Sequence, residues 1–563
     1  MSRMVLSMLA LVVPLGGLGM VAGSANRDVK PVAVLAVAGY EQAMQDVAMI
    51  GRLTDNPNLG DGVEAIGLLL TRGQGIPGLD KERPCGAVAL TNGSKMAGYV
   101  FLPVDDAGTL LDAVGHLTKV EPVGDGVHKL QTDDGPLFVA EKSPGWLIAS
   151  KHRRVIALAD GDPSPIIDGL TPEYDVAFRV FAQNIPEHHR RGALAKIHAD
   201  HQRDSAQRPG ESEHEYLIRK TVGDELVGLI TTTVEDVDQI TLGWSLDHEA
   251  EDASLELSLT AVPGSPTAEA LAEMEPIRSR FSGFAPREAA LSMQWAGPMP
   301  SHKREAITAM LKTIRPQLKD QIALEHEQQG KSGEETRVAQ QLVADVVDVI
   351  EQTARADDVD GGAAVLLRPD AATVVMGEQV VDVEKLEDWA RKITAFAKAE
   401  HPELDQLIRL DADRADDVRF HTIMLPIDED EENREALVRL VGEQIEVAVG
   451  VGDEALYLAA GRDALAVLKQ AIADSASAAG DVVEPMRVSL GVRPVVDFVA
   501  QFGDTEEERV KATAVGELLD QIDDDARLEL IAEAKDDGLT YRFHVSPGVL
   551  KLLGRLYVSP HLD

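Results

Sequence analysis

Two histidines three residues apart, His198 and His201, form the spacing in this chain that is closest to a metal-binding pattern. On a helix, side chains at positions i and i+3 share a face, so two imidazole nitrogens can bind one transition metal ion. Lys196 and Arg203 lie among them, and this composition is also typical of a helix face in solvent. His198 and His201 are therefore the candidate metal ligands, with a solvated helix as the alternative.

The other patterns associated with cofactor binding, metal binding or catalysis are either incomplete or lie next to the wrong secondary structure. The segment 73–78 has the glycine spacing of a dinucleotide-binding turn, but a helix precedes it where a strand is required, so we interpret it as a helix-ending turn. The acidic run that begins at Asp411 does not fit a helix–loop–helix calcium site, because Ala415, Asp416 and Thr422 stand at positions 5, 6 and 12. The motifs GxSxG, HExxH, GxxxxGK[ST] and CxxC are absent from the sequence. We expect no cofactor.

Cysteine and tryptophan usage indicates how the fold is held together. Cys85 is the only cysteine, so no internal disulfide can form, and its place at the start of an apolar run predicts a buried thiol. The tryptophans also lie within apolar patterns and are predicted to be core residues. They are Trp146, Trp244, Trp295 and Trp389.

The elements that must position any site occur twice, in the same order. In the first half, residues 240–246 and 255–262 alternate apolar and polar side chains around a polar turn, which predicts a β-hairpin. In the second half, residues 528–534 and 539–545 have the same pattern. A Pro-Gly pair and an amphipathic helix follow each predicted hairpin.

Earlier elements correspond as well. Predicted strands at 174–181 and 486–492 are each followed by helices, as are those at 32–38 and 289–296. The pair Asn92-Gly93 predicts a type I′ hairpin turn, in which both residues have positive φ. The predicted fold class is α+β, with two divergent tandem copies of a mainly antiparallel sheet and helices packed on one face. Two unrelated α+β domains are the alternative.

The N-terminus has the pattern of an export signal. Arg3 precedes the apolar run 4–13, and small residues at 22–25 suit a signal peptidase, so we expect cleavage after Ala25. The apolar run is shorter than the ~20 residues that span a bilayer, and a permanent membrane anchor is the alternative. The expected organisation is a signal peptide at 1–25, a first α+β repeat at 26–280 and a second α+β repeat at 281–563.

The net charge of the chain limits the kinds of partner that it can bind. The chain has 563 residues, of which 95 are acidic and 54 basic, for a formal net charge of −41. Nucleic acid and anionic lipid surfaces are bound through clustered Lys and Arg, so we expect neither as a partner, and we expect no membrane span after the signal. Cations, a basic protein or a neutral small molecule remain. Acid excess also keeps a protein soluble in salt, which is the alternative reason for the charge.

Three segments resemble an uncharacterised group of exported proteins from planctomycete bacteria. They are the start of the mature chain at 31–37, the turn at 78–81 and the strand at 98–103. The similarity extends over much of residues 30–300. It implies a bacterial exported protein and assigns no catalytic or binding residue.

These observations predict an exported, non-catalytic protein that acts as a binding or structural component of the periplasm or cell envelope, or outside the cell. The alternative is a hydrolase whose site is assembled from residues distant in sequence, because such sites have no local motif. The sequence does not identify the ligand.

Overall fold

A computed structural model describes residues 29–558, apart from 71–75, 209–210, 212, 273, 275–276, 300, 329, 401, 428–433, 479–481, 504 and 536–537. The predicted signal peptide and the glycines at 73 and 75 lie outside the described residues. Within them, no helix has the length and hydropathy needed to cross a bilayer.

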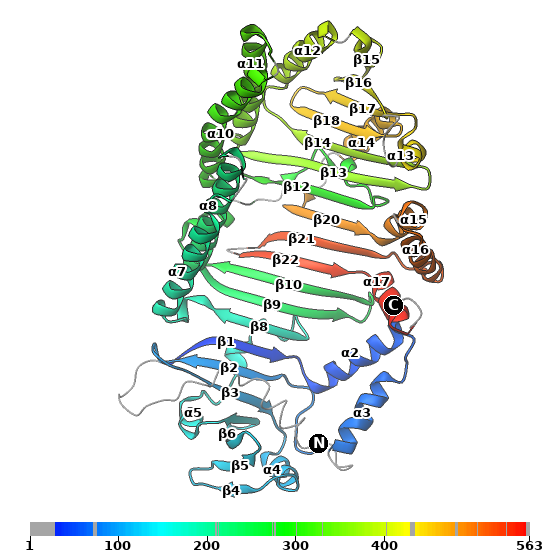
Figure 1. Ribbon diagram of the computed structural model, residues 1–563. Coiled ribbons are helices and arrows are strands. Elements are labelled where there is room, and N and C mark those ends of the chain that lie inside the picture. The colour runs from blue at the N-terminus through cyan, green and yellow to red at the C-terminus, as the bar shows by residue number, and fades with distance from the viewer. Residues whose placement is uncertain are drawn as a thin grey trace.

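The core of the molecule is one 20-stranded sheet in which all neighbouring strands are antiparallel (Figure 1). The first-half strands are β1 (Lys30–Val37), β2 (Cys85–Thr91), β3 (Met96–Pro103), β4 (Val120–Pro122), β5 (His128–Thr132), β6 (Gly135–Ser143), β7 (Trp146–Ser150), β8 (Val176–Phe181), β9 (Val237–Asp247) and β10 (Asp252–Ala261). The second-half strands are β12 (Leu291–Pro298), β13 (Asp358–Arg368), β14 (Ala371–Gln379), β15 (Ile408–Ala415), β16 (Val418–Pro426), β17 (Gln444–Val451), β18 (Ala455–Gly461), β20 (Met486–Gly491), β21 (Arg527–Lys535) and β22 (Gly538–Val545). A separate pair joins β11 (Ile277–Arg278) to β19 (Val482–Val483).

Strand order is the same in the two halves. The first half runs β4-β5-β6-β7-β3-β2-β1-β8-β9-β10 across the sheet. The second half runs β15-β16-β17-β18-β14-β13-β12-β20-β21-β22, which is the same order of corresponding strands. The two halves meet where β10 pairs with β22, with Leu257 opposite Tyr541. The predicted sheets are thus two parts of one continuous antiparallel sheet.

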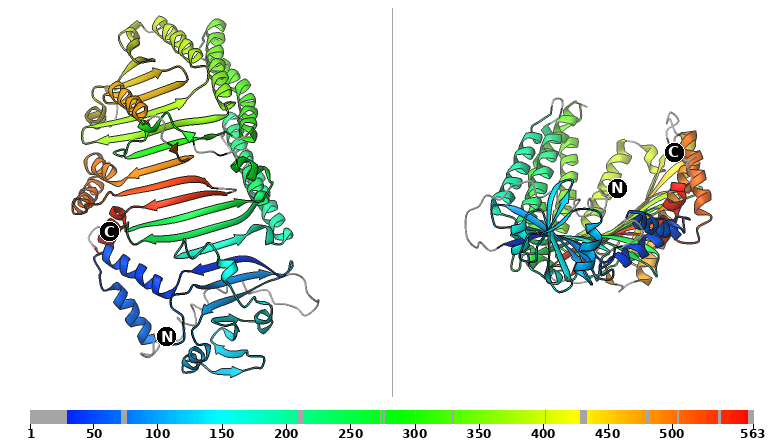
Figure 2. Two further views of the ribbon diagram at one scale, coloured as in Figure 1. Left: turned by 180° about the vertical axis from the view of Figure 1, so that it is seen from behind. Right: turned by 90° about the horizontal axis from the view of Figure 1, so that it is seen from below.

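Long helices stand along both margins of the sheet (Figure 2). One margin carries α7 (Glu187–Asp204), α8 (Glu213–Asp236), α10 (Ser301–Gln328) and α11 (Gly333–Ala354). The other carries α2 (Tyr40–Leu53), α3 (Leu59–Leu70), α15 (Val492–Phe502), α16 (Glu506–Leu519) and α17 (Pro547–Val558). Shorter or outer helices are α4 (Ala107–Gly115), α5 (Arg153–Leu158), α6 (Ser164–Ile167), α9 (Pro266–Ala272), α12 (Val383–Glu400), α13 (Arg434–Val441) and α14 (Ala464–Ser477), with 3-10 turns η2 (Ala182–Asn184), η3 (Ser282–Phe284) and η4 (Pro402–Asp405).

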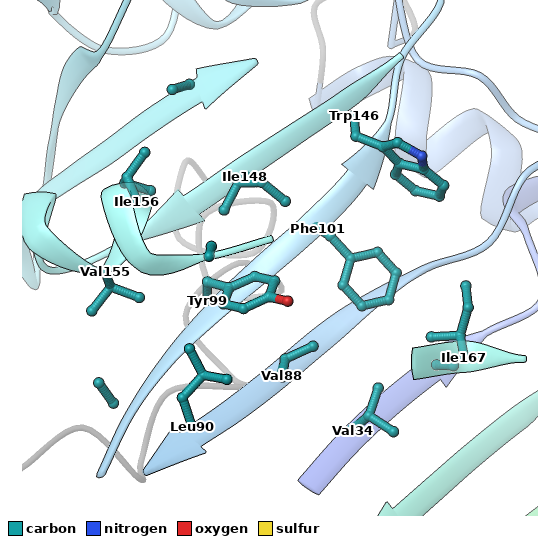
Figure 3. Packing of buried hydrophobic residues seen from close by; sticks show 14 of the residues in the cluster. Val34, Val88, Leu90, Tyr99, Phe101, Trp146, Ile148, Val155, Ile156 and Ile167 are labelled. Atoms are coloured by element: carbon teal, nitrogen blue, oxygen red, sulfur yellow. The ribbon is translucent and has the colours of Figure 1, made fainter. Parts of the chain in front are cut away.

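The prediction that helices pack on one face is wrong for the outer strands. Side chains alternate between faces along β7, where Trp146 and Ile148 join a buried cluster with Val155 of α5 (Figure 3). Leu147 instead belongs to a cluster with Leu110 of α4 on the opposite face. Because these strands carry apolar side chains on both faces, a helix is needed on each face to remove them from water.

The predicted hairpin after β2 is confirmed, but its turn type is wrong. Thr91 pairs with Met96, which leaves a four-residue connection at 92–95. Gly93 has φ +86°, whereas Asn92 is not among the positive-φ residues, so a type I′ turn is not formed. Asn92 Oδ1 instead accepts hydrogen bonds from the backbone N–H groups of Ser94 and Lys95. This local side-chain acceptor organises a longer loop than a two-residue turn.

Candidate functional site: an uncovered apolar face

Two rows of uncharged side chains cross the middle of the sheet on one face. The first row, in cross-strand register, is Leu35, Phe178, Leu242, Leu257, Tyr541, Ala532, Met486 and Trp295. The second row is Val37, Val176, Trp244, Leu255, Phe543, Leu530, Val488 and Met293. We call these two rows the central apolar face; they lie on β1, β8, β9, β10, β22, β21, β20 and β12.

Much of the central apolar face is open to solvent. Leu242 is 43% exposed, Phe543 39% and Trp244 37%, all high values for large apolar side chains in the middle of a sheet. The prediction that Trp244 is a core residue is therefore wrong, whereas Trp146 is buried at 5% exposure. A contiguous apolar patch on the order of several hundred Å² is typical of a binding site rather than of an inert surface.

Marginal helices frame this face without covering it. At one end of the strands, Leu246 and Val545 extend the same face into a buried cluster with Met49 of α2, Leu519 of α16 and Leu552 of α17. Seen along the sheet, the long helices rise from both margins and the strands between them form the base (Figure 2, right). The arrangement leaves the middle of the face accessible from one side.

The opposite face is mainly polar on β9, β10, β12, β20 and β22, whereas on β1 it carries Val34 and Ala36, which are buried in an apolar cluster. At the junction of the halves, the hydroxyl of Tyr174 donates to Glu256 (2.9 Å), which also pairs with Arg542. Ser258 and Thr540 share a cross-strand hydrogen bond of 2.8 Å. Burial and the neighbouring Glu256 carboxylate raise the pKa of Tyr174, so this phenol stays protonated and donating. These contacts join the two halves through satisfied polar pairs.

A cavity of about 500 Å³ lies on this polar face and contains the best-placed histidine for acid–base chemistry. His544 Nε2 lies 2.8 Å from Asp252 and its Nδ1 lies 3.9 Å from Glu529. Ser546 in the same cavity donates to the backbone carbonyl of Asp525. Both ring nitrogens of His544 are directed at carboxylates. Ser254 lies opposite His544 on β10, but its hydroxyl is hydrogen-bonded to Ser245, and no hydrogen bond joins His544 to a serine among the described residues.

The predicted metal ligands lie on α7, where both histidines face α8. His201 Nε2 is 2.7 Å from Asp224, and the hydroxyl of Ser205 also lies near the ring. His198 Nε2 is 3.2 Å from the hydroxyl of Thr231. Each imidazole thus has its own polar partner on α8, although His198 is exposed and His201 is half-buried. Metal binding by His198 and His201 stays a prediction.

A different trio brings ligand atoms together, and the sequence did not suggest it. Atoms of Glu387, Asp411 and His421, on α12, β15 and β16, all lie within 4.8 Å of one another. Arginine already occupies both carboxylates: Arg391 binds Glu387 at 2.6 Å and Asp411 at 2.9 Å, and Arg419 also binds Glu387. The group carries as many positive as negative charges before any metal is added.

The His421 ring also argues against a metal there. Its Nδ1 accepts a hydrogen bond from the backbone N–H of Asp411 (3.0 Å). In a neutral ring the proton then resides on Nε2, which leaves no lone pair for a metal ion. Burial lowers the pKa of His421, so the ring is neutral near pH 7. We interpret the group as an ionic cluster that fastens α12 to the outer strands.

The structure also shows the positions of Cys85 and of Gly78, for which the sequence predicted a buried thiol and a turn. Cys85 begins β2 and is half-buried, and burial raises the pKa of its thiol, so it is a poor nucleophile. Gly78, at the end of the dinucleotide-like segment, has φ +80° and forms a turn before β2. This agrees with a turn at that position.

Comparison of the chain with protein-family models, with curated proteins and with solved structures finds no match.

The central apolar face was not anticipated, although its signal is present in the sequence. In both predicted hairpins one alternating set of residues carries no charge, and most of the intervening residues are polar, apart from Gly243, Val262 and Ile531. Such alternation indicates one face in water and one face covered. Sequence reasoning assigned the cover to helices, and the structure places those helices at the margins.

Proposed function

We propose that this protein is an exported, non-catalytic binding protein of the periplasm or cell envelope, and that it holds an apolar ligand on the central apolar face. The observation that carries the proposal is the pair of uncharged rows that cross eight strands with side chains 37–43% exposed, such as Leu257 and Leu242. Export is inferred from the leader pattern at residues 1–25.

Energetics favour a bound ligand. Removing apolar surface from water stabilises by roughly 25 cal/mol per Å², and Leu242, Leu255 and Leu257 of the face are 37–43% exposed. A ligand that covers the face recovers this free energy, and the face itself offers no charged group for chemistry. This chemistry supports the proposal of binding without catalysis.

We also propose that the two halves are divergent tandem copies, with the boundary near residue 280. The support is the shared order of ten corresponding strands in each half, together with helix pairs inserted after corresponding strands: α2 and α3 after β1, and α10 and α11 after β12. Two unrelated domains have no reason to agree in both respects. The junction at β10 and β22 then joins corresponding edges of the two copies.

A neutral fluorescent dye tests the proposed function. Nile red should bind the purified mature protein, and replacing two central leucines (Leu255→Asp with Leu257→Asp) should weaken that binding about tenfold or more, because charged groups must then be desolvated. Val510→Asp is the matched control, since Val510 is 62% exposed on α16, away from the face. Unchanged dye affinity in the double variant, with native circular dichroism, contradicts the proposal.

A further inference from the structure

We infer that the ligand carries a quaternary ammonium group, and that this group binds against the carboxylate of Glu378 and the indole of Trp295. This inference rests on the proposed function, because the hydrocarbon part of the same ligand lies on the apolar face. It adds the chemical class of the ligand and the residues that recognise its charge.

Glu378 is a carboxylate set into the apolar face. Beyond Trp295 of β12, the first row continues in register through Gly361 of β13 to Glu378 of β14 (Figure 1). Leu456 of β18 is opposite Glu378 on the other side. The second row continues beside them through uncharged residues, which are Ala363, Met376 and Leu458. Among these described positions, Glu378 has the one charged side chain.

The carboxylate of Glu378 lacks a partner. No hydrogen bond or ion pair reaches it in the described part of the chain, and burial alone raises the pKa of its carboxyl group. Other partly buried glutamates are paired, as Glu256 is with Arg542 and Glu387 with Arg391. Taking a carboxylate out of water without a partner costs free energy, and a bound cation offsets part of that cost. The formal net charge of −41 attracts cations in the same way at longer range.

An aromatic ring lies next to this carboxylate because position 361 has no side chain. The indole of Trp295 lies over Gly361, where a Cβ atom would come within 2.7 Å of the indole Nε1 and 2.6 Å of two ring carbons. Directly opposed residues of antiparallel strands have Cα atoms about 4.5–5.5 Å apart, so the ring over Gly361 is adjacent to Glu378. A tryptophan ring attracts cations through its π electrons. Ring and carboxylate can therefore act on the same cation.

The surroundings favour a quaternary ammonium over other cations. Calcium and magnesium ions take several oxygen ligands, and a primary ammonium has N–H groups that each need an acceptor. Around the site, Glu378 is the only described side chain of the two rows that offers acceptor oxygens. A quaternary ammonium has no N–H group, so it leaves no donor unpaired among aliphatic neighbours. Its methyl groups also contact an indole ring favourably.

The hydrocarbon part of the ligand has a surface beside this site. Met293, Leu458 and Val374 lie on the same face, and all three are exposed. Val374 precedes Glu378 by four residues on β14, so at about 3.4 Å per residue the apolar surface extends roughly 14 Å from the carboxylate. A slender hydrocarbon chain that begins at an ammonium group on Glu378 can cover these side chains.

The first half has a valine where the second half has this carboxylate. When strands are counted outward from the junction of β10 and β22 along the first row, Val100 of β3 has the place of Glu378. Val100 is buried in the cluster that contains Leu110 of α4. The carboxylate thus occurs in the half whose face stays open at this position, and one ammonium site per chain is expected.

Isothermal titration calorimetry with dodecyltrimethylammonium, below the concentration at which it forms micelles, tests the site. At about 0.15 M sodium chloride, which screens the field of distant carboxylates, the purified mature protein should bind one molecule. Glu378→Gln should weaken this binding about tenfold or more, and Trp295→Leu about threefold or more. Glu506→Gln removes an equal charge from an exposed position on α16 and is the matched control, which should leave the affinity unchanged.

The unaltered chain provides a second measurement that does not depend on how a variant folds. Dodecyltrimethylammonium should bind about fivefold or more tightly than dodecylammonium, whose N–H groups lack acceptors at the site. Equal affinities for the two ligands, or unchanged affinity in Glu378→Gln, overturn the inference. Nile red binding that persists in these cases leaves the proposed function intact. Absence of binding for both the ammonium ligand and Nile red overturns the proposed function as well.

Discussion

On one face of the sheet, the apolar side chains of the outer first-half strands are buried, whereas many of those on the central strands are exposed to solvent. On the outer strands of the first half, Val100 and Leu147 are 8% and 4% exposed, because Leu110 of α4 packs with them. On the central strands, Leu242 and Trp244 are 43% and 37% exposed. Both parts alternate apolar and polar residues in the sequence. What differs is whether a helix lies over the strands, and we infer that the uncovered part is kept for a ligand.

The second half shows the contrast only in part, because Val374 of β14 and Leu458 of β18 lie on the same face and are 49% and 42% exposed. Val449 and Leu456 of its outer strands pack with Val383 and Leu386 of α12. Central Met293 is 39% exposed. The helices α4 and α12 follow the corresponding strands β3 and β14, but α12 covers less of its outer strands than α4 does.

The largest expected effect comes from truncating covered and uncovered phenylalanines. Phe101 is fully buried and packs edge-on against Trp146, so Phe101→Ala should cost about 3–5 kcal/mol of unfolding free energy. Phe543→Ala, on the uncovered face, should cost about 1 kcal/mol. Urea unfolding of the ligand-free protein measures both. Equal losses would mean that Phe543 is also covered, and the comparison would fail.

A smaller effect is expected where α12 is fastened to the outer strands. Arg419→Met removes a partner from buried Glu387 and should cost about 1–3 kcal/mol at pH 7. Burial alone would raise the pKa of Glu387, but hydrogen bonding from Arg391 and the charge of Arg419 outweigh it and hold the pKa below the usual 4.5.

The sign of its pH dependence follows. A lowered carboxyl pKa stabilises the fold above about pH 4.5, and that contribution is lost as pH falls through the folded pKa. The difference between wild type and Arg419→Met should therefore shrink in acid, as measured by urea unfolding at pH 7 and pH 3. A constant difference would indicate that packing, not charge, holds α12. Arg493→Met, at an exposed pair on α15, is the control.

A still smaller effect concerns His421 under the same helix. Burial lowers its pKa below the usual 6.5, so the unfolded chain binds a proton that the folded protein excludes. Stability should fall as pH drops below 6.5, by at most about 1.4 kcal/mol per pH unit, until the folded pKa is reached. His421→Asn keeps an acceptor for the N–H of Asp411 and should flatten this slope. An unchanged slope between pH 7 and 5 would place the titrating group elsewhere.

The smallest effect should come from making the uncovered face polar. Leu255→Ser should change the unfolding free energy by about 0.5 kcal/mol or less, because its side chain is already 38% exposed. Val100→Ser, beneath α4, should cost about 2–4 kcal/mol through lost burial and an unpaired hydroxyl. Thermal melts of the pair, without ligand, compare covered and uncovered positions directly.

Much of the local structure was predictable from the sequence. Alternation predicted the hairpins β9–β10 and β21–β22, and 3.6-residue periodicity predicted helices near α2, α10 and α11, all confirmed. Outer strands such as β4 and β15 were missed. β4 has only three residues, too few for a periodicity, whereas the first six residues of β15 (Ile-Arg-Leu-Asp-Ala-Asp) do alternate, so its signal was present in the sequence.

The order of apolar and polar residues along the chain therefore determined most of the strands and helices, and which positions of each strand share a face. The two-residue and 3.6-residue periodicities are local, so they can be read without the tertiary structure. Tertiary structure alone decided where the helices dock. Their position depends on packing between elements far apart in the chain, as where α2 meets α17 beside the ends of β10 and β22. The same docking brought Glu387 to Arg419 and left Leu242 and Trp244 uncovered. No local pattern contains that information, since it arises from the summed burial of surfaces that meet only in the folded chain.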